Sequence, residues 1–212
     1  MSGLSRRTLA RRLESIADFE DPSVSLEQYL TPAELAAHIC HLAGLQDDLD
    51  RQVVDLGTGT GMLAIGAALA GADRVAGIDV DSDALELARR NERAVVGESG
   101  DPDHALAWLR GDVARHPFSI SDATVVSNPP FGAQRGNRHA DRAFLETASE
   151  IATVSYTIHN EGSQAFVESF AADEGGGVTH AFRAEFPIAK RFAFHTETRE
   201  ALEAEVFRIE WE

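Results

Sequence analysis

Residues 55–61 read DLGTGTG and lie between a predicted strand, residues 52–56, and a predicted apolar helix, residues 62–70. Glycines at such a turn allow positive φ angles and let a ligand lie against backbone N–H groups at the start of a helix. Counted from Gly57, a dinucleotide fingerprint G-x-G-x-x-G would need glycine where the chain has Met62. Counted from Gly59, the spacing ends on Ala64, so a nicotinamide or flavin site is weakened but stays open.

Predicted strands and helices alternate outward from this turn. The predicted strands are residues 52–56, 74–79, 105–110, 124–127, 153–158, 178–186 and 203–211, and the predicted helices are residues 5–17, 31–42, 62–70, 82–95, 140–151 and 163–172. Thr31 is expected to be the N-cap of its helix, with Pro32 at the first helical position. The alternation predicts an α/β fold, a doubly wound and mostly parallel seven-stranded sheet with helices on both faces and an antiparallel pair at one edge.

Length and composition fit one soluble domain. The chain has 212 residues, of which 43% are hydrophobic and 25% charged, as in ordinary globular proteins. The longest nearly uncharged apolar stretch, residues 62–72, is about half of the ~20 residues that a membrane span needs, and the N-terminus lacks the apolar core of a signal peptide. We expect a single cytoplasmic domain over residues 1–212, with a helical extension at 1–45 and a core at 50–212. One cysteine and eight scattered histidines predict no intrinsic metal.

The charge balance is strongly acidic. Acids outnumber bases by 35 to 19, the net charge is −16, and Lys190 is the sole lysine. At ordinary salt such a charge opposes binding to nucleic acid, because phosphates are repelled. At ~1 M salt the Debye length falls to about 3 Å and this diffuse repulsion disappears. An acid excess almost without lysine is typical of a high-salt cytoplasm, so we interpret the chain as halophilic and conclude nothing about RNA from its net charge.

An acidic residue, Asp79, ends the strand that follows the glycine-rich turn. A carboxylate about 20 residues after the first glycine can accept both ribose hydroxyls of a nucleotide. The Asp-x-Gly-x-Gly-x-Gly pattern at residues 55–61 resembles the nucleoside-binding loop of class I S-adenosylmethionine-dependent methyltransferases. Their cofactor needs a close backbone approach to its methionyl part, a carboxylate for the ribose and a polar group for the adenine. We expect Asp112, just after the third strand, to supply the last of these.

The tetrapeptide Asn128-Pro129-Pro130-Phe131 follows the fourth predicted strand. The first and fourth strands flank the switch point of an open α/β sheet, so the tetrapeptide should lie beside the glycine-rich turn. An amino group offers two N–H donors, which the side-chain oxygen of Asn128 and the carbonyl of Pro129 can accept. This would turn the nitrogen lone pair toward the sulfonium methyl group, while Phe131 stacks on a planar substrate. We expect these four residues to be catalytic.

The tetrapeptide resembles the catalytic motif of methyltransferases that act on adenine N6, guanine N2 or the side-chain nitrogen of glutamine. Further matching segments are Phe19-Glu20-x-Pro22, Leu26-Glu27-Gln28-Tyr29-x-Thr31, Gly132 after the tetrapeptide, Phe144-Leu145 and Tyr156-x-x-His159. Over nearly its whole length the chain resembles archaeal relatives of methyltransferase-like protein five, the small-subunit ribosomal RNA adenosine N6-methyltransferase family. The resemblance implies methyl transfer from S-adenosylmethionine to N6 of an adenosine in 16S- or 18S-type ribosomal RNA.

The resemblance also implies which residues hold the cofactor. In that family the segment before the first strand folds over S-adenosylmethionine, so residues 1–45 would include a cofactor flap and residues 50–212 would form the catalytic core. The residues expected to contact the cofactor are Gln28, Thr31, Asp55, Gly57, Thr60, Met62, Asp79, Asp112 and Val113. For Thr31 the role of a plain helix cap carries equal weight.

Basic side chains are expected to hold the RNA backbone around a flipped-out target base. The expected RNA-binding residues are Arg135, Arg138, His139 and Arg142 after the catalytic tetrapeptide, and Lys190 and Arg191 between the last two strands. Relatives carry more lysine near the C-terminus, which puts RNA affinity at low salt in question but not the chemistry.

The third strand, residues 105–110, is expected at an open edge of the sheet. It is apolar around Trp108 and has no charge before Arg110, whereas exposed edges normally carry charge or proline. Trp108 taken alone is better explained by packing under the neighbouring helix. The family resemblance implies a small zinc-binding activator protein, and we expect it to form a heterodimer by strand addition along residues 105–110, with Trp108 near the centre.

Two other functions stay open. A protein glutamine N-methyltransferase shares Asn-Pro-Pro followed by an aromatic residue. A nucleotide-binding scaffold could keep the fold and lack catalysis, although the intact tetrapeptide at residues 128–131 argues against it.

Overall fold

One mixed sheet of seven strands forms the centre of the computed structural model, which describes residues 4–97, 105–130, 140–189 and 199–212. The strand order is β3-β2-β1-β4-β5-β7-β6, in which β7 alone runs antiparallel, to both β5 and β6. The strands are β1 (Val53–Leu56), β2 (Arg74–Asp79), β3 (Ala105–Arg110), β4 (Ala123–Ser127), β5 (Ala152–Asn160), β6 (Gly176–Ala189) and β7 (Arg199–Trp211). The predicted doubly wound, mostly parallel sheet is confirmed.

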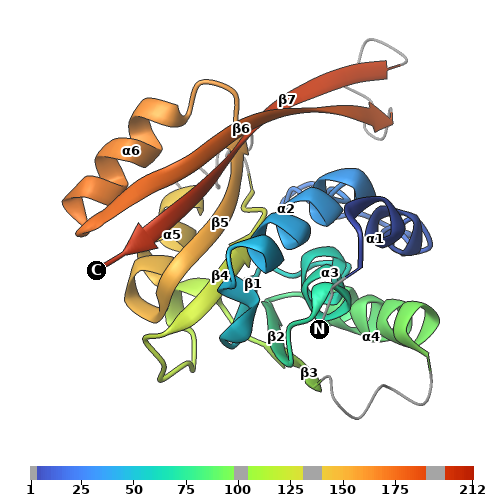
Figure 1. Cartoon of the computed structure of the whole chain (residues 1–212). Helices are drawn as coiled ribbons and strands as arrows, with labels where there is room; N and C mark the ends of the chain where they lie inside the picture. Colours follow the sequence, from blue (N-terminus) through green and yellow to red (C-terminus); the bar gives the residue numbers. More distant parts are fainter. Residues whose placement is uncertain (1–3, 98–104, 131–139, 190–198) are drawn as a thin grey trace.

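Helices cover both faces of this sheet (Figure 1). They are α1 (Arg6–Leu13), α2 (Ala33–Leu45), α3 (Met62–Ala70), α4 (Ser82–Val96), α5 (Ala140–Ile151) and α6 (Gln164–Asp173), with the short 3-10 turns η1 (Asp48–Asp50) and η2 (Val113–Arg115). Helices α2, α3 and α4 lie on one face, with α1 packed outside them, and α5 and α6 lie on the other. Adjacent residues of β1 face opposite layers, since Val53 packs with the first group and Val54 with the second.

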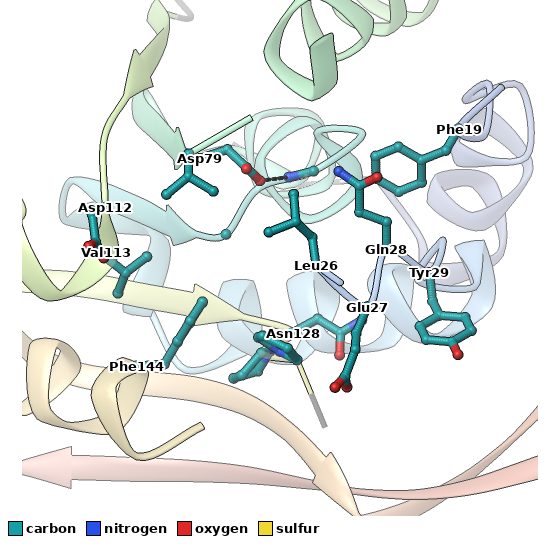
Figure 2. A pocket seen from close by; sticks show the side chains of 15 residues that line it. Phe19, Leu26, Glu27, Gln28, Tyr29, Asp79, Asp112, Val113, Asn128 and Phe144 are labelled. Carbon is teal, nitrogen blue, oxygen red and sulfur yellow. Dashed lines mark hydrogen bonds between the residues drawn. The ribbon is translucent and has the colours of Figure 1, made fainter. Parts of the chain in front are cut away.

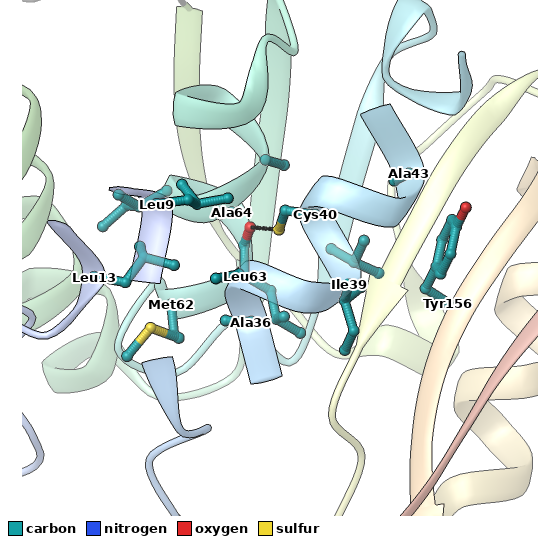
Figure 3. Packing of buried hydrophobic residues seen from close by; sticks show 14 of the residues in the cluster. Leu9, Leu13, Ala36, Ile39, Cys40, Ala43, Met62, Leu63, Ala64 and Tyr156 are labelled. Carbon is teal, nitrogen blue, oxygen red and sulfur yellow. Dashed lines mark hydrogen bonds between the residues drawn. The ribbon is translucent and has the colours of Figure 1, made fainter. Parts of the chain in front are cut away.

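Helix α2 is sandwiched between α1 and the sheet (Figure 3). Leu9 and Leu13 of α1 lie on one side of it, and Tyr156 of β5 lies on the other. Cys40 of α2 is fully buried in this layer, and burial raises the pKa of its thiol. The cysteine is therefore a small core residue, as the sequence indicates.

The predicted end of the first helix and the predicted cap of the second are wrong. The first helix ends at Leu13 rather than at residue 17, because the backbone N–H and carbonyl of Ala17 are both hydrogen-bonded to the side chain of Asn91. Thr31 is not the N-cap of α2. The carbonyl of Pro32 accepts the first helical hydrogen bonds, and the Thr31 side chain is used elsewhere.

The C-terminal hairpin is longer than predicted. Strand β6 has 14 residues and β7 has 13. The ladder between β5 and β7 ends where Asn160 pairs with Ala204, so the outer part of the hairpin extends past the carboxyl ends of the parallel strands (Figure 1). Ring stacking of His38 on Phe182, at 4.4 Å between centroids, fastens the hairpin to α2.

Within the described residues, no helix is long and apolar enough to cross a membrane. The same part of the chain contains no group of three or more histidine, cysteine or acidic side chains placed to hold a metal ion.

Candidate active site

The glycine-rich turn after β1 is shaped by close neighbours. Gly57 and Gly59 have φ angles of 67° and 52°, in the left-handed region that favours glycine. A Cβ on Gly57 would lie 2.8 Å from the ring of Phe144, and one on Gly59 would lie 3.1 Å from the ring of Phe19. Any side chain here would fill the space where the backbone of the turn faces the cavity.

Asp55 holds this turn against helix α3. Its carboxylate is 1% exposed, and Oδ2 accepts hydrogen bonds from Thr58 Oγ1 at 2.7 Å and from the backbone N–H of Ala64 at 3.0 Å. Burial raises the pKa of Asp55 to about 7, against the opposing effect of these two hydrogen bonds. Asp55 lies at the wall of the site, and its geometry is that of a group that positions the turn.

Asp79 ends β2 and faces the cavity (Figure 2). Its Oδ2 accepts from the backbone N–H of Gly59 at 2.8 Å, and its Oδ1 accepts from the N–H of Asp81 at 2.9 Å. Burial raises the pKa of Asp79, while the two backbone donors act in the opposite direction. A carboxylate oxygen can accept two hydrogen bonds, so both oxygens retain capacity for the hydroxyls of a ribose.

Asp112 and Val113 border the same cavity from beyond β3. Asp112 is exposed, and its Oδ1 accepts from the backbone N–H of Ala114 at 3.0 Å as the N-cap of η2. The backbone N–H of Gly111 donates to the carbonyl of Asp79 at 2.9 Å, which ties the ends of β2 and β3 together. The carboxylates expected to hold ribose and adenine therefore lie on neighbouring strand ends.

The segment before α2 folds over this edge of the sheet. The side chain of Gln28 fastens it: Oε1 accepts from the backbone N–H of Ser23 at 2.7 Å, and Nε2 donates to Asp81 Oδ2 at 2.7 Å. Asn91 of α4 fastens the earlier part, because its Nδ2 donates both to the carbonyl of Ala17 and to that of Thr60 in the glycine-rich turn. Gln28 thus links the segment before α2 to the turn between β2 and α4, and it also lines the cavity.

Asn128 lies at the end of β4, beside the glycine-rich turn, as predicted. Its Nδ2 donates to Thr31 Oγ1 at 3.0 Å. Its Oδ1 is buried and has no hydrogen-bond partner among the residues that the structure describes. Pro129 and Pro130 line the cavity with it, whereas Phe131 lies outside the described residues. A buried acceptor without a partner is costly, so this oxygen marks a place where a donor is needed.

All nine residues expected to hold the cofactor line one of two adjoining cavities. The larger cavity is lined by Gln28, Gly57, Asp79, Asp112 and Val113, together with Asn128. The smaller one is lined by Thr31, Asp55, Gly57, Thr60 and Met62, again with Asn128. The two share Tyr29, Gly57, Gly59 and Asn128, and so form one site around Asn128.

Several lining residues were given no role on the sequence alone. They are Phe19, Leu26, Glu27, Tyr29, Val80 and Phe144. Five of them lie in the segments that carried the family resemblance, which was the available signal. Val80 had none beyond its place next to Asp79.

Of the expected RNA-binding residues, the structure describes Arg142 alone. Its Nε donates to Glu146 Oε1 at 2.9 Å, and its guanidinium lies 5.2 Å from the ring centroid of Phe170. These contacts hold it along α5. Arg135, Arg138, His139, Lys190 and Arg191 lie outside the described residues.

Strand β3 lies at the open edge of the sheet, as predicted, and Trp108 packs under the neighbouring helix, as favoured for the tryptophan taken alone. Its indole Nε1–H donates to Glu92 Oε2 of α4 at 2.6 Å. A Cβ added to Gly77 or Gly61 would lie 2.8 or 2.9 Å from the indole ring. Trp108 therefore packs beneath α4, and the sheet edge itself is formed by the backbone of β3.

The site fits S-adenosylmethionine. Two glycines leave room for a ligand against the turn, Asp79 offers carboxylate oxygens that can accept from ribose hydroxyls, and the buried Oδ1 of Asn128 has no donor among the described residues. Residues 39–176 match the family described as methyltransferase small domain. The fold and the site thus define an S-adenosylmethionine-dependent methyltransferase.

Individual relatives narrow this class. The chain is 36% identical to an uncharacterised protein of Methanocaldococcus jannaschii, over 98% of this chain and 94% of that protein. It is 31% identical to the rRNA N(6)-adenosine-methyltransferase Mettl5 of Drosophila melanogaster, over 99% and 98% of the two chains. A crystal structure of a proposed RNA methyltransferase from Pyrococcus horikoshii superposes with a TM-score of 0.85 at 36% identity, over 98% of both chains. The chain belongs to the methyltransferase small domain family and, within it, to the METTL5-type rRNA N(6)-adenosine-methyltransferases.

Proposed function

We propose that this chain transfers the methyl group of S-adenosylmethionine to N6 of an adenosine in small-subunit ribosomal RNA. The observation that carries the proposal is the buried Oδ1 of Asn128 next to the glycine-rich turn, which has no hydrogen-bond partner among the described residues. An exocyclic amine supplies the N–H donor that this oxygen lacks. The activity of the Drosophila relative supports adenosine N6 in ribosomal RNA as the amine. The choice of the small subunit rests on the sequence resemblance, and such a substrate fits the expected cytoplasmic location.

The chain's own residues bind and orient the cofactor. S-adenosylmethionine supplies an electrophilic methyl group on its sulfonium sulfur. Asp79 accepts hydrogen bonds from the ribose hydroxyls, and Asp112 with Val113 borders the adenine. The backbone around Gly57 and the side chains of Thr60 and Met62 border the methionyl part. Asp55 and Gln28 hold the turn and the covering segment in place.

Asn128 and Pro129 orient the amine of the target base. The amine donates one N–H to Asn128 Oδ1 and the other to the carbonyl of Pro129, so that its lone pair leaves the plane of the base. This lone pair forms the new N–C bond while the C–S bond breaks and its electron pair stays on sulfur. The nitrogen then loses a proton to water. A strong base is unnecessary, because the proton leaves only after positive charge has formed on nitrogen.

Basic side chains outside the described residues are proposed to bind the RNA backbone. Arg135, Arg138 and His139 follow the catalytic tetrapeptide in the sequence, and Lys190 and Arg191 lie between β6 and β7. The described part of the hairpin that flanks Lys190 and Arg191 in the sequence extends past the same edge of the sheet as Asn128. Phosphate contacts from these residues would position the strand without reading its sequence.

Mapping N6-methyladenosine in ribosomal RNA from cells with and without the gene tests the proposal. We expect one adenosine of the small-subunit RNA to lose its methyl group in the deletion strain and to regain it when the gene is restored. An unchanged map would overturn the rRNA assignment. Loss of a methylated glutamine from a protein would favour the glutamine N-methyltransferase instead.

We also propose a heterodimer with a small zinc-binding activator protein that adds a strand to β3. The position of β3 at the sheet edge supports this, since an edge strand presents unpaired backbone groups. Because Trp108 packs beneath α4, the backbone of residues 105–110 rather than the indole would make the contact. Co-expression followed by size-exclusion chromatography should show a complex. A fully active monomer whose elution ignores the activator would contradict it.

A further inference from the structure

Thr31 places a buried hydroxyl against the proposed catalytic amide. The residue is 7% exposed and directly precedes Pro32, whose carbonyl accepts the first hydrogen bonds of α2. Since the Thr31 side chain does not cap the helix, its hydroxyl is available to serve the site. Its Oγ1 accepts a hydrogen bond from Asn128 Nδ2 at 3.0 Å, across 97 residues of sequence.

The two ends of an asparagine side chain have nearly the same shape but opposite hydrogen-bonding character. The oxygen accepts and the NH2 group donates, so rotating the amide by about 180° exchanges them at little steric cost. Only the orientation with Oδ1 toward the substrate can accept an N–H from an amine. In the reversed orientation the NH2 group of Asn128 would face the N–H group of the amine, and two donors cannot form a hydrogen bond.

We propose that Thr31 is a positioning residue that holds the Asn128 amide in place with Oδ1 toward the target amine, a role that rests on the proposed function. By accepting from Nδ2, Thr31 leaves Oδ1 as the end that meets the target amine. The consequence lies in the chemical step: the amine donates to Oδ1, its lone pair bonds to the methyl carbon, the C–S electron pair goes to sulfur, and the nitrogen then loses a proton to water.

Thr31 also lines the smaller cavity, where it was expected to contact the cofactor. The two roles differ in the step they affect. If the threonine hydroxyl binds the cofactor, its removal raises the Kd for S-adenosylmethionine and leaves the rate at saturating cofactor intact. If the hydroxyl positions Asn128, its removal lowers that rate and leaves the Kd nearly unchanged.

Thr31→Val and Thr31→Ser separate these roles, because valine keeps the shape and removes the hydroxyl, whereas serine keeps the hydroxyl. In single-turnover methylation of ribosomal RNA at saturating cofactor, we expect Thr31→Val to be about tenfold slower, the scale of removing one hydrogen bond. Thr31→Ser should retain most of the rate. Calorimetric titration should give a Kd for S-adenosylmethionine within about twofold of wild type for both variants, a change too small to represent the removal of a hydrogen bond.

Thr124→Val provides a matched control. Thr124 is a fully buried threonine whose hydroxyl donates to the carbonyl of Asp48 at 2.5 Å, at the start of β4 and away from the cavities. Its substitution should lower the melting temperature and leave the rate constant unchanged. Thr31→Val should lower the rate constant and leave the melting temperature close to that of wild type.

A second background sharpens the test. In Asn128→Asp both ends of the side chain are oxygens, so orientation no longer decides whether an acceptor faces the amine. Thr31→Val should then lower the remaining rate by less than about twofold, because an oxygen faces the amine whether or not the Thr31 hydroxyl donates to the carboxylate. An equal tenfold loss in both backgrounds would overturn the proposal.

The single variants decide the matter if Asn128→Asp is too slow to measure. A wild-type rate for Thr31→Val, a slow Thr31→Ser, or a loss confined to cofactor affinity would each reject the positioning role. Failure of the rRNA assignment is distinguishable, because wild-type protein would then methylate no ribosomal RNA. The ratio of Thr31→Val to wild type could still be measured on whichever amine is methylated.

Discussion

Two buried polar regions of this protein are built in opposite ways. Near the start of β1, Asp48 accepts from Tyr156 Oη at 2.6 Å and from Arg208 Nε and Nη2 at 2.8 and 3.1 Å. At the carboxyl edge, Asn128 keeps one buried oxygen without a partner in the described structure, and burial raises the pKa values of Asp55 and Asp79. The first region satisfies its own groups. The second leaves hydrogen-bonding capacity that a ligand can use.

This difference separates stability from function within a single sheet. In the Asp48 cluster, burial and the hydrogen bond to Asp48 raise the pKa of Tyr156, so the phenol stays a neutral donor to the carboxylate. Substitutions in the cluster should act on the free energy of unfolding. Substitutions around Asn128 should act on binding or on the rate of methyl transfer.

The largest expected effect is on stability, in Arg208→Ala. Removing the guanidinium takes two hydrogen bonds from the buried Asp48 carboxylate and leaves it a longer ion pair with Arg51, at 3.9 Å. The loss should lower the free energy of unfolding by about 3–5 kcal/mol. Denaturant titration measures this. Arg90→Ala in α4 is the control, because Arg90 and its ion-pair partner Glu20 are 61% and 86% exposed, and such a pair should contribute about 0–1 kcal/mol. Equal losses in the two variants would remove the contrast between a paired interior cluster and the surface.

Asn128→Ala should show the reverse pattern. Methyl transfer should fall by at least about 100-fold, the scale of losing one positioned polar group in a site. Melting temperature and affinity for S-adenosylmethionine should stay close to wild type, since Oδ1 makes no hydrogen bond within the described structure. Single-turnover kinetics and calorimetry on the same preparation measure the three quantities. A wild-type rate would show that this oxygen takes no part in the reaction.

Asp79→Ala should weaken cofactor binding rather than the chemical step. The loss of charge-assisted hydrogen bonds to the ribose should cost about 1.5–3 kcal/mol of binding free energy. Asp73→Ala is the matched control, because Asp73 is an exposed acid just before β2, at the opposite end of that strand. Unchanged affinity for S-adenosylmethionine in Asp79→Ala, measured by calorimetric titration, would reject the ribose assignment.

The smallest expected effect is the pH dependence that Asp55 adds to stability. Its pKa is about 7 in the folded chain, above the ordinary value, so the folded state retains a proton that the unfolded state has lost. Wild-type stability should therefore fall as pH rises through this window. Asp55→Asn lacks the titration, and the stability advantage of wild type over the variant should shrink by about 1–2 kcal/mol between about pH 6 and about pH 8. An advantage that grows with pH would mean that folding lowers the pKa of Asp55.

The sequence was sufficient for the features that depend on local periodicity. Alternating strands and helices predicted the sheet, and the position of each loop at a strand end brought residues 55–61, Asp79 and Asn128 together. The switch-point rule for open α/β sheets explains why this works: loops at the carboxyl ends of adjacent strands must converge.

Contacts between residues far apart in the sequence explain the predictions that were wrong. Thr31 looked like a helix cap because the threonine–proline pair is a local signal, but its hydroxyl binds Asn128 97 residues away. Trp108 was expected near the centre of a partner contact because the sequence does not show that its indole donates to Glu92 of α4. The hydrogen bond from Gln28 to Asp81, and those from Asn91 to the carbonyls of Ala17 and Thr60, likewise have no signature in the local sequence.

One assay distinguishes adenosine methylation that depends on Asn128 from glutamine methylation and from adenosine methylation that does not need Asn128. Purified protein is incubated with ribosomal subunits and methyl-labelled S-adenosylmethionine, and the nucleosides and peptides are then analysed by mass spectrometry. We predict label in N6-methyladenosine of the small-subunit RNA with wild-type protein, and almost none with Asn128→Ala of equal melting temperature and cofactor affinity. Label in protein glutamine, or equal labelling of adenosine by the two proteins, would contradict the proposed reaction.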